Sequence, residues 1–176
     1  MKKAFTMLEL VFAIIVIGIL AAAIIPRVGS SVVQERAIQL VSHIRYTQHL
    51  AMVDDKFNIN TADWYSNRWQ LVFNANQYSI VSNDGTRFAE NPDNSGDDFQ
   101  NITLDGVTVA LSGGCNGQTI ISFDHLGRVM VGDLSDDTAS YITGQLMTTT
   151  CVITITDDST TSTINIEPET GYAHII

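Results

Sequence analysis

The sequence predicts an α+β protein: a long N-terminal helix, with a transmembrane half and an amphipathic half, packed on an antiparallel β-sheet domain. Three observations support this. Phe5 to Ile25 is an apolar run of 21 residues. Apolar residues with helical spacing follow it, and from Lys56 onward the pattern alternates with a period of two. The predicted organisation is a short basic stretch at 1–4, a membrane helix at 5–25, its amphipathic continuation at 26–55 and a β-rich domain at 56–176.

The apolar run is long enough to cross a bilayer as a helix. At about 1.5 Å per residue it spans roughly 30 Å, the thickness of the hydrocarbon core. Lys2 and Lys3 precede it, which predicts a cytoplasmic amino terminus. Glu9 lies inside the run, where a charge costs about 2.5–3.5 kcal/mol on insertion scales and is functional by default. Gly18 and Pro26 are weak points of this helix, either as sites of unwinding during assembly or as a passive kink.

Three interpretations of this segment are open. A secretory signal peptide would be cleaved near the alanines at 21–23, but the apolar run is longer than the usual stretch of about 7–15 residues. A plain membrane anchor leaves Glu9 unexplained. The third interpretation rests on a resemblance. Ala4-Phe5-Thr6 followed by Glu9 closely resembles the amino terminus of type IV pilins and type II secretion pseudopilins, although the family more often has Gly where Ala4 stands.

This resemblance implies processing and assembly through the same residues. In the family, a prepilin peptidase cleaves before the Phe and methylates the new amine, which here implies cleavage between Ala4 and Phe5 and methylation of Phe5. Glu9 of one subunit can then pair with the Phe5 amine of its neighbour, which removes the cost of a lone carboxylate and sets the axial register. The implied filament-assembly residues are Phe5, Thr6 and Glu9.

The resemblance also implies location and partners. The chain would be a single-pass inner-membrane protein with its amino terminus in the cytoplasm and its C-terminal domain in the periplasm, and would later enter a pseudopilus or pilus. Its implied partners are prepilin peptidase, other pilins or pseudopilins, an inner-membrane assembly platform and the lipid bilayer. The chain is acidic, with a formal charge of −10 at pH 7, and no basic run follows Lys3. This composition argues against a nucleic-acid partner.

The chain has two cysteines, Cys115 and Cys151. The predicted topology places both outside the cytoplasm, where disulfides persist, so we expect one bridge. The bridge would close a loop of about 36 residues and stabilise the fold by on the order of 3–4 kcal/mol in the chain-entropy model. Two unpaired thiols are the alternative. A zinc site is a weaker one, because no histidines at fixed spacing accompany the cysteines.

Helical spacing continues beyond Pro26. The apolar positions that follow the three-four spacing of an amphipathic helix are Val33, Ala37, Leu40, Val41, Ile44 and Ala51. Polar residues fill the other face: Gln34, Glu35, Gln39, Ser42, His43 and Arg45. We expect this half to end near Asp54-Asp55 and to form, with the membrane half, one helix of roughly 50 residues.

Period-two alternation predicts about eight short antiparallel strands, in one sheet bent over the helix or in two packed sheets. The expected strands are Arg68–Phe73, Gln77–Val81, Ile102–Leu111, Thr119–Phe123, Val129–Val131, Tyr141–Met147, Cys151–Thr156 and Thr163–Ile166. The first two should form a hairpin around Ala75-Asn76. Residues Asn83 to Asp98 are rich in Asp, Asn, Gly and Pro, which predicts an exposed loop. The aromatic residues expected in the core are Trp64, Trp69, Phe73, Phe123 and Tyr141.

The distal part carries a second, more diffuse resemblance. It resembles the H-type minor pseudopilins of type II secretion and the related minor pilins of type IV pili. The residues that carry it are the step from Ile121 to Arg128, the strand from Val152 to Asp157, the closing Ile164–Ile166 with Thr170-Gly171-Tyr172, and the helical portion Leu40–Ala51.

No catalytic constellation stands out, and we expect neither an enzyme nor a cofactor or metal. The histidines are scattered, which favours surface or capping roles for His43, His49, His125 and His174. Gly113 to Gly117 lacks the Lys-Ser/Thr of a phosphate loop and predicts a turn. Asp93-x-Ser95-x-Asp97 has the first ligand spacings of a calcium loop but lacks its glycine and closing glutamate, which leaves calcium binding open.

The sequence as a whole therefore predicts a structural pilin-like subunit, and both a type II secretion pseudopilus and a type IV pilus fit. One alternative is a minor pilin with a binding role in adhesion or DNA uptake. Exposed Arg and Lys near the carboxyl end would support DNA uptake, but Tyr172–Ile176 contains neither. The other alternative, a membrane-anchored enzyme, lacks a nucleophile and base in any recognisable arrangement.

Overall fold

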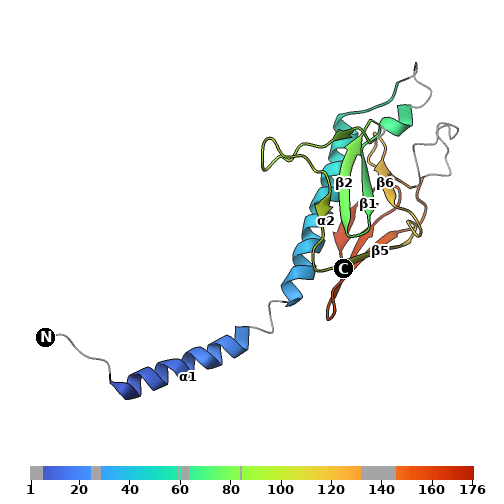
Figure 1. Ribbon diagram of the computed structural model, residues 1–176. Helices are drawn as coiled ribbons and strands as arrows, with labels where there is room; N and C mark the ends of the chain where they lie inside the picture. The colour runs from blue at the N-terminus through green and yellow to red at the C-terminus, as the bar shows by residue number, and fades with distance from the viewer. Residues whose placement is uncertain (1–5, 25–28, 59, 61–63, 84, 132–145) are drawn as a thin grey trace.

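The computed structural model describes residues 6–24, 29–58, 60, 64–83, 85–131 and 146–176. Two helices, α1 (Met7–Ile24) and α2 (Gly29–Val53), precede a β-rich part, and all the strand pairs are antiparallel. The predicted α+β class is therefore confirmed. Figure 1 shows that α2, rather than α1, lies against the strands. The predicted continuity of the two helices falls on 25–28, and Pro26 with it, outside the described residues.

Within the described residues, no helix meets both the length and the apolar character that a membrane span requires.

The second helix packs as its spacing predicts. All six apolar positions named above are buried, with Ala37, Leu40 and Ile44 fully inaccessible to solvent. Because they recur every three or four residues, they form one stripe that faces the strands. The helix ends at Val53, and the next residue, Asp54, accepts a hydrogen bond at 3.1 Å from the indole nitrogen of Trp69. This contact fastens the end of the helix to the β-rich part.

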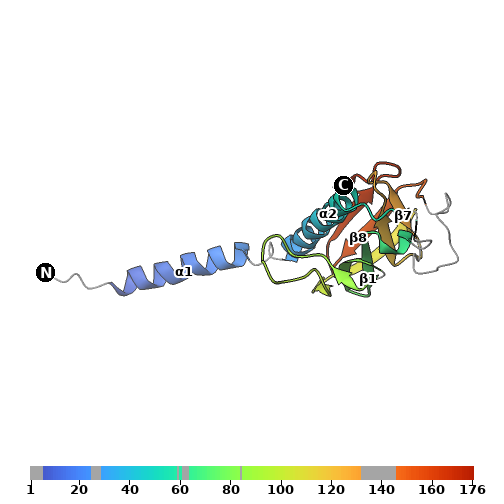
Figure 2. The same ribbon diagram turned by 90° about the horizontal axis from the view of Figure 1, so that it is seen from above.

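The strands within the described residues form two sheets. The first has the order β3 (Arg87–Phe88), β2 (Gln77–Ser82), β1 (Gln70–Asn74), β6 (Ile120–Phe123), β7 (Val129–Val131), and β4 (Ile102–Thr103) also pairs with β2. The second has the order β10 (Ala173–Ile175), β9 (Thr161–Ile166), β8 (Cys151–Thr156), β5 (Thr108–Gly113). Helix α2 contacts β10, β9 and β8 of the second sheet and β6 and β1 of the first. Figure 2 shows α2 running along this layer of strands.

Several strands match their predicted positions. The bounds of β7 and β8 agree with the prediction, and β1, β2, β6 and β9 differ from it by no more than two residues at either end. The hairpin around Ala75-Asn76 is also confirmed, because Asn74 pairs with Gln77 across a two-residue turn. Ala75 adopts a positive φ of 52° in that turn, as tight hairpin turns require.

One predicted strand is wrong and one predicted loop is only partly right. Ile102–Leu111 contains two short strands, β4 and β5, that belong to different sheets. The chain changes sheets at Gly106, whose φ of 80° suits glycine. Most described residues of the segment Asn83–Asp98 are exposed, as predicted, but the segment also contains β3 and the buried Ala89. Backbone hydrogen bonding attaches the stretch around Ala89 to β2, since the Ala89 N–H donates to the Ile80 carbonyl at 3.0 Å.

The predicted aromatic core is confirmed for Trp69, Phe73 and Phe123, which are all buried. Trp64 is only half-buried, in the short 3₁₀ helix η2 (Trp64–Asn67), so its assignment to the core was wrong. Tyr141 and most of the expected strand Tyr141–Met147 lie outside the described residues. At the end of that range Leu146 forms an isolated bridge with Met130.

The predicted disulfide is present. Cys115 and Cys151 are bonded, with their Cα atoms 5.0 Å apart, and both are fully buried. Cys151 begins β8 and pairs in register with Gly113 at the end of β5. The bridge therefore fastens the turn after β5 to the strand beside it.

Candidate functional site

The first helix begins with a capping arrangement that the sequence also encodes. Thr6 immediately precedes α1, and its side-chain oxygen accepts a hydrogen bond from the Glu9 N–H at 3.3 Å. Its carbonyl oxygen accepts from the N–H groups of Glu9 and Leu10 at 3.1 and 3.2 Å. A Thr followed three residues later by Glu is the sequence pattern of a capping box. Thr6 therefore fixes where the helix starts and places Glu9 in the first turn.

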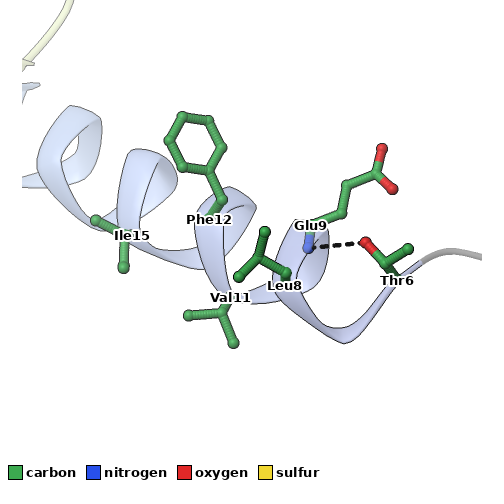
Figure 3. Close-up of a pocket in the computed structure, with 6 residues that line it drawn as sticks. All are labelled: Thr6, Leu8, Glu9, Val11, Phe12 and Ile15. Carbon is green, nitrogen blue, oxygen red and sulfur yellow. Dashed lines mark hydrogen bonds between the residues drawn. The ribbon is translucent and has the colours of Figure 1, made fainter.

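Glu9 is an exposed acid at the positive end of a helix dipole. Its backbone lies in the first turn, where the N–H groups without a partner inside the helix carry partial positive charge. In Figure 3 the carboxylate projects away from the helix, and the dashed bond joins the Glu9 backbone nitrogen, not its carboxylate, to Thr6. Within the described part of the chain, the Glu9 carboxylate has no ion-pair partner.

Apolar side chains surround this acid. The helix surface has an open depression beside Glu9 (Figure 3). Its lining consists of Thr6 and Glu9 together with the apolar Leu8, Val11, Phe12 and Ile15. Leu8 is 82% exposed and Phe12 is 69% exposed. The exposed apolar side chains continue along the helix to Leu20. A helix that exposes apolar side chains on all its faces needs a cover, either lipid or other helices.

Of the other predicted site residues in this region, only Gly18 is among the described residues. Ala4, Phe5 and Pro26 lie outside the described residues, so the predicted cleavage, methylation and kink positions there stay predictions. Helix α1 runs through Gly18 without interruption. A Cβ atom at Gly18 would meet nothing within 4 Å, so the space around it is open.

The acidic residues considered for calcium lie beside α2. Asp93 and Asp97 line a depression with His43, and the side-chain amide of Asn94 donates to Asp97. Among the described residues, no group of three His, Cys, Asp or Glu side chains is placed to hold a metal ion.

Two features of the described structure were missed at the sequence level. The first is the capping role of Thr6, although the Thr-x-x-Glu pattern was available to reveal it. The second is His43, assigned to a surface or capping role but in fact half-buried and hydrogen-bonded to Tyr78 at 2.6 Å. No sequence signal could have revealed this pair, because 35 positions separate the two residues. His49 and His125 are exposed, as expected, and the His174 ring stacks on Tyr172.

Comparison of the chain with protein-family models, with curated proteins and with solved structures finds no match.

Proposed function

We propose that this chain is a structural subunit of a pilin-like filament: an H-type minor pseudopilin of a type II secretion pseudopilus or the related minor pilin of a type IV pilus. One observation carries the proposal. The first helix exposes apolar side chains on all sides and carries in its first turn an acid with no ion-pair partner among the described residues. The apolar side chains of such a helix are stabilised when lipid or other helices bury them. Once the carboxylate is buried with them, it needs a cation as its partner.

The cover changes during the life of the subunit. The proposed membrane segment, Phe5 to Ile25, extends beyond the described helix at both ends. Before assembly, lipid chains cover the apolar side chains. In the filament, the first helices of neighbouring subunits replace the lipid. This exchange keeps the same apolar surface buried in both states, so assembly does not have to expose it to water.

Glu9 makes assembly specific. After cleavage between Ala4 and Phe5, the new amine of Phe5 is a cation four positions before Glu9 in sequence. Within one chain this amine lies before the capping residue Thr6, and in a neighbouring subunit it can approach Glu9. A buried carboxylate alone is costly, so the axial stagger that brings the amine to it is favoured over other staggers. Thr6 contributes by fixing the start of the helix and hence the position of Glu9.

The remainder of the chain suits a location outside the cytoplasm. The Cys115–Cys151 disulfide fits an oxidising compartment such as the periplasm. Helix α2 contacts strands of both sheets, so the helix and the sheets form one packed unit that follows the proposed assembly helix in the chain. Prepilin peptidase, an inner-membrane assembly platform and other pilins or pseudopilins are the partners that this proposal requires.

The experiment that tests the proposal substitutes Glu9. Glu9→Gln keeps the size of the side chain and removes its charge, so insertion into the membrane and processing should be retained. Its incorporation into filaments should fall at least tenfold in competition with wild type, if the pair contributes about 1.4 kcal/mol or more. Crosslinking between subunits in native membranes, followed by quantification of each form, measures this. Glu35→Gln, an exposed acid on α2, is the matched control.

The decisive comparison is between the two variants. If Glu9→Gln and Glu35→Gln both assemble as well as wild type, Glu9 is not an assembly contact and the proposal loses its mechanism. If Glu9→Gln is retained in the membrane but absent from filaments, the proposed pairing is supported.

A further inference from the structure

We propose that His43, Tyr78 and Phe99 form an acid-sensitive lock that holds α2 against β2 and the segment 85–99, and that protonation of His43 weakens it. This inference concerns the β-rich part and does not depend on the proposed role of the first helix.

The lock brings three elements together around one imidazole. His43 on α2 lies with its Nδ1 atom 2.6 Å from the hydroxyl oxygen of Tyr78 on β2. The ring of Phe99 also packs against the His43 imidazole, with the two ring centroids 4.4 Å apart. Tyr78 is 1% exposed and Phe99 is 7% exposed, so the contact is shielded from water. The imidazole therefore joins the helix to both the strand and the segment.

The direction of the hydrogen bond follows from burial. Burial raises the pKa of Tyr78 above its usual range, so the phenol keeps its proton. The Tyr78 hydroxyl then donates, and Nδ1 of a neutral His43 accepts with its own proton on Nε2. Within the described residues, the hydroxyl has no other hydrogen-bond partner. Protonation of His43 would add a proton to Nδ1 while Nε2 keeps its own. Nδ1 could then no longer accept, and the buried hydroxyl would lose its acceptor.

The charges around His43 act in opposite directions. Burial lowers the pKa of His43 below its usual value of 6.5, and the negative charge of Asp93 partly offsets this. Asp97 and Asp98 line the same depression as His43. From α2, Arg36 favours the ionised form of Tyr78 but is outweighed by burial there. The titratable and charged groups around the lock are Arg36 and Tyr46 on α2, and Glu90, Asp93, Asp97 and Asp98 on the segment.

The segment and β2 behave as one layer. The N–H of Ile80 donates to the Phe99 carbonyl at 2.9 Å, and the Ile80 carbonyl accepts from Ala89 at 3.0 Å. Two side-chain hydrogen bonds link this layer to α2: the one between His43 and Tyr78, and the one that the Tyr46 hydroxyl donates to the Glu90 carbonyl at 3.1 Å. Arg87 on β3 adds an ion pair at 3.9 Å to Asp54, the residue after the helix. Weakening the His43 contact therefore loosens the layer from the helix rather than the segment from the strand.

The sign of the pH effect follows from the lowered pKa. Above the ordinary value of 6.5 His43 is neutral in the folded and unfolded chains, and the lock contributes fully. As the pH falls below 6.5 the unfolded chain binds a proton that the folded chain resists, so stability decreases until the lowered folded pKa is reached. The further the folded pKa lies below the unfolded one, the larger the decrease in the folding constant.

The first measurement is urea unfolding of the full chain in detergent micelles, followed by tryptophan fluorescence at pH 7.5 and 5.5. Between these pH values the folding constant of wild type should fall more than that of His43→Gln, by a factor of up to about ten, the limit set by the unfolded pKa of 6.5. His49→Gln, an exposed histidine on the same helix, should retain the wild-type dependence. An equal pH dependence for wild type and His43→Gln would overturn the proposal.

The second measurement titrates His43 directly by NMR and needs no variant to fold. In wild type the imidazole should titrate below 6.5. In Tyr78→Phe, which removes only the hydroxyl, its pKa should rise because the neutral form loses its hydrogen bond. A wild-type pKa at or above 6.5, or a pKa unchanged by Tyr78→Phe, would show that the contact is structural packing without acid sensitivity.

Discussion

Ile44 and Ile38 offer a matched test of how α2 is held. They are the same residue type on one helix, but Ile44 is fully buried and Ile38 is 56% exposed. Replacing Ile44 by Ala removes three carbon atoms from the core. At about 0.8 kcal/mol for each buried carbon, the lost transfer free energy is about 2.4 kcal/mol, and the cavity left behind raises the total to about 3–4 kcal/mol.

The same substitution at Ile38 should have little effect. About half of the side chain is already in water, so the lost burial is about 1 kcal/mol, and the better helix propensity of Ala offsets part of it. The free energy of unfolding should therefore differ between the two variants by about 2–3 kcal/mol.

Urea unfolding of the full chain in detergent, followed by circular dichroism, measures both values. The two-state assumption is checked by coincidence with tryptophan fluorescence. Equal destabilisation by both substitutions would refute the packing of α2 described here. So would a negligible effect of Ile44→Ala, because a residue in a packed core cannot lose three carbons without cost.

Three further predictions concern the processing site and the disulfide. Mass spectrometry of the amino-terminal peptide from native membranes should find cleavage between Ala4 and Phe5 with a methylated Phe5 amine; a mature terminus at Ile24 would indicate a secretory signal peptide instead. Alkylation without reductant should label neither Cys115 nor Cys151, and full labelling of both would contradict the bridge. Replacing both by Ser should lower the free energy of unfolding by about 4 kcal/mol in the chain-entropy model, given their sequence separation of 36.

The parts of the fold that the sequence predicted are those set by local periodicity. Burial along α2 follows from three-four spacing, because that spacing places one stripe of side chains on one face. The bounds of β8 follow from strict alternation, since each inward residue is apolar: Cys151, Ile153 and Ile155. The cysteine pairing followed from there being only two cysteines in a predicted oxidising compartment.

The candidate site was predicted from a short motif for the same reason. Glu9 is conspicuous in sequence because an acid in an apolar run is costly wherever the run folds. Its capping residue Thr6 is three positions away, so the whole first turn of α1 is local information. What surrounds this helix in a filament is not local, and that part of the site stays a proposal.

Only the tertiary structure decided which segments meet. The division of the strands into two sheets, with β4 and β5 on different sheets, depends on pairings between segments distant in sequence. The burial of Ala89 within a polar segment depends on its pairing with Ile80. The His43–Tyr78 contact forms because packing brings α2 and β2 together, and no pattern in the sequence marks either residue as a partner of the other. Composition and periodicity fix which faces of an element are apolar, whereas the choice of partner for each face is made by packing across the whole chain.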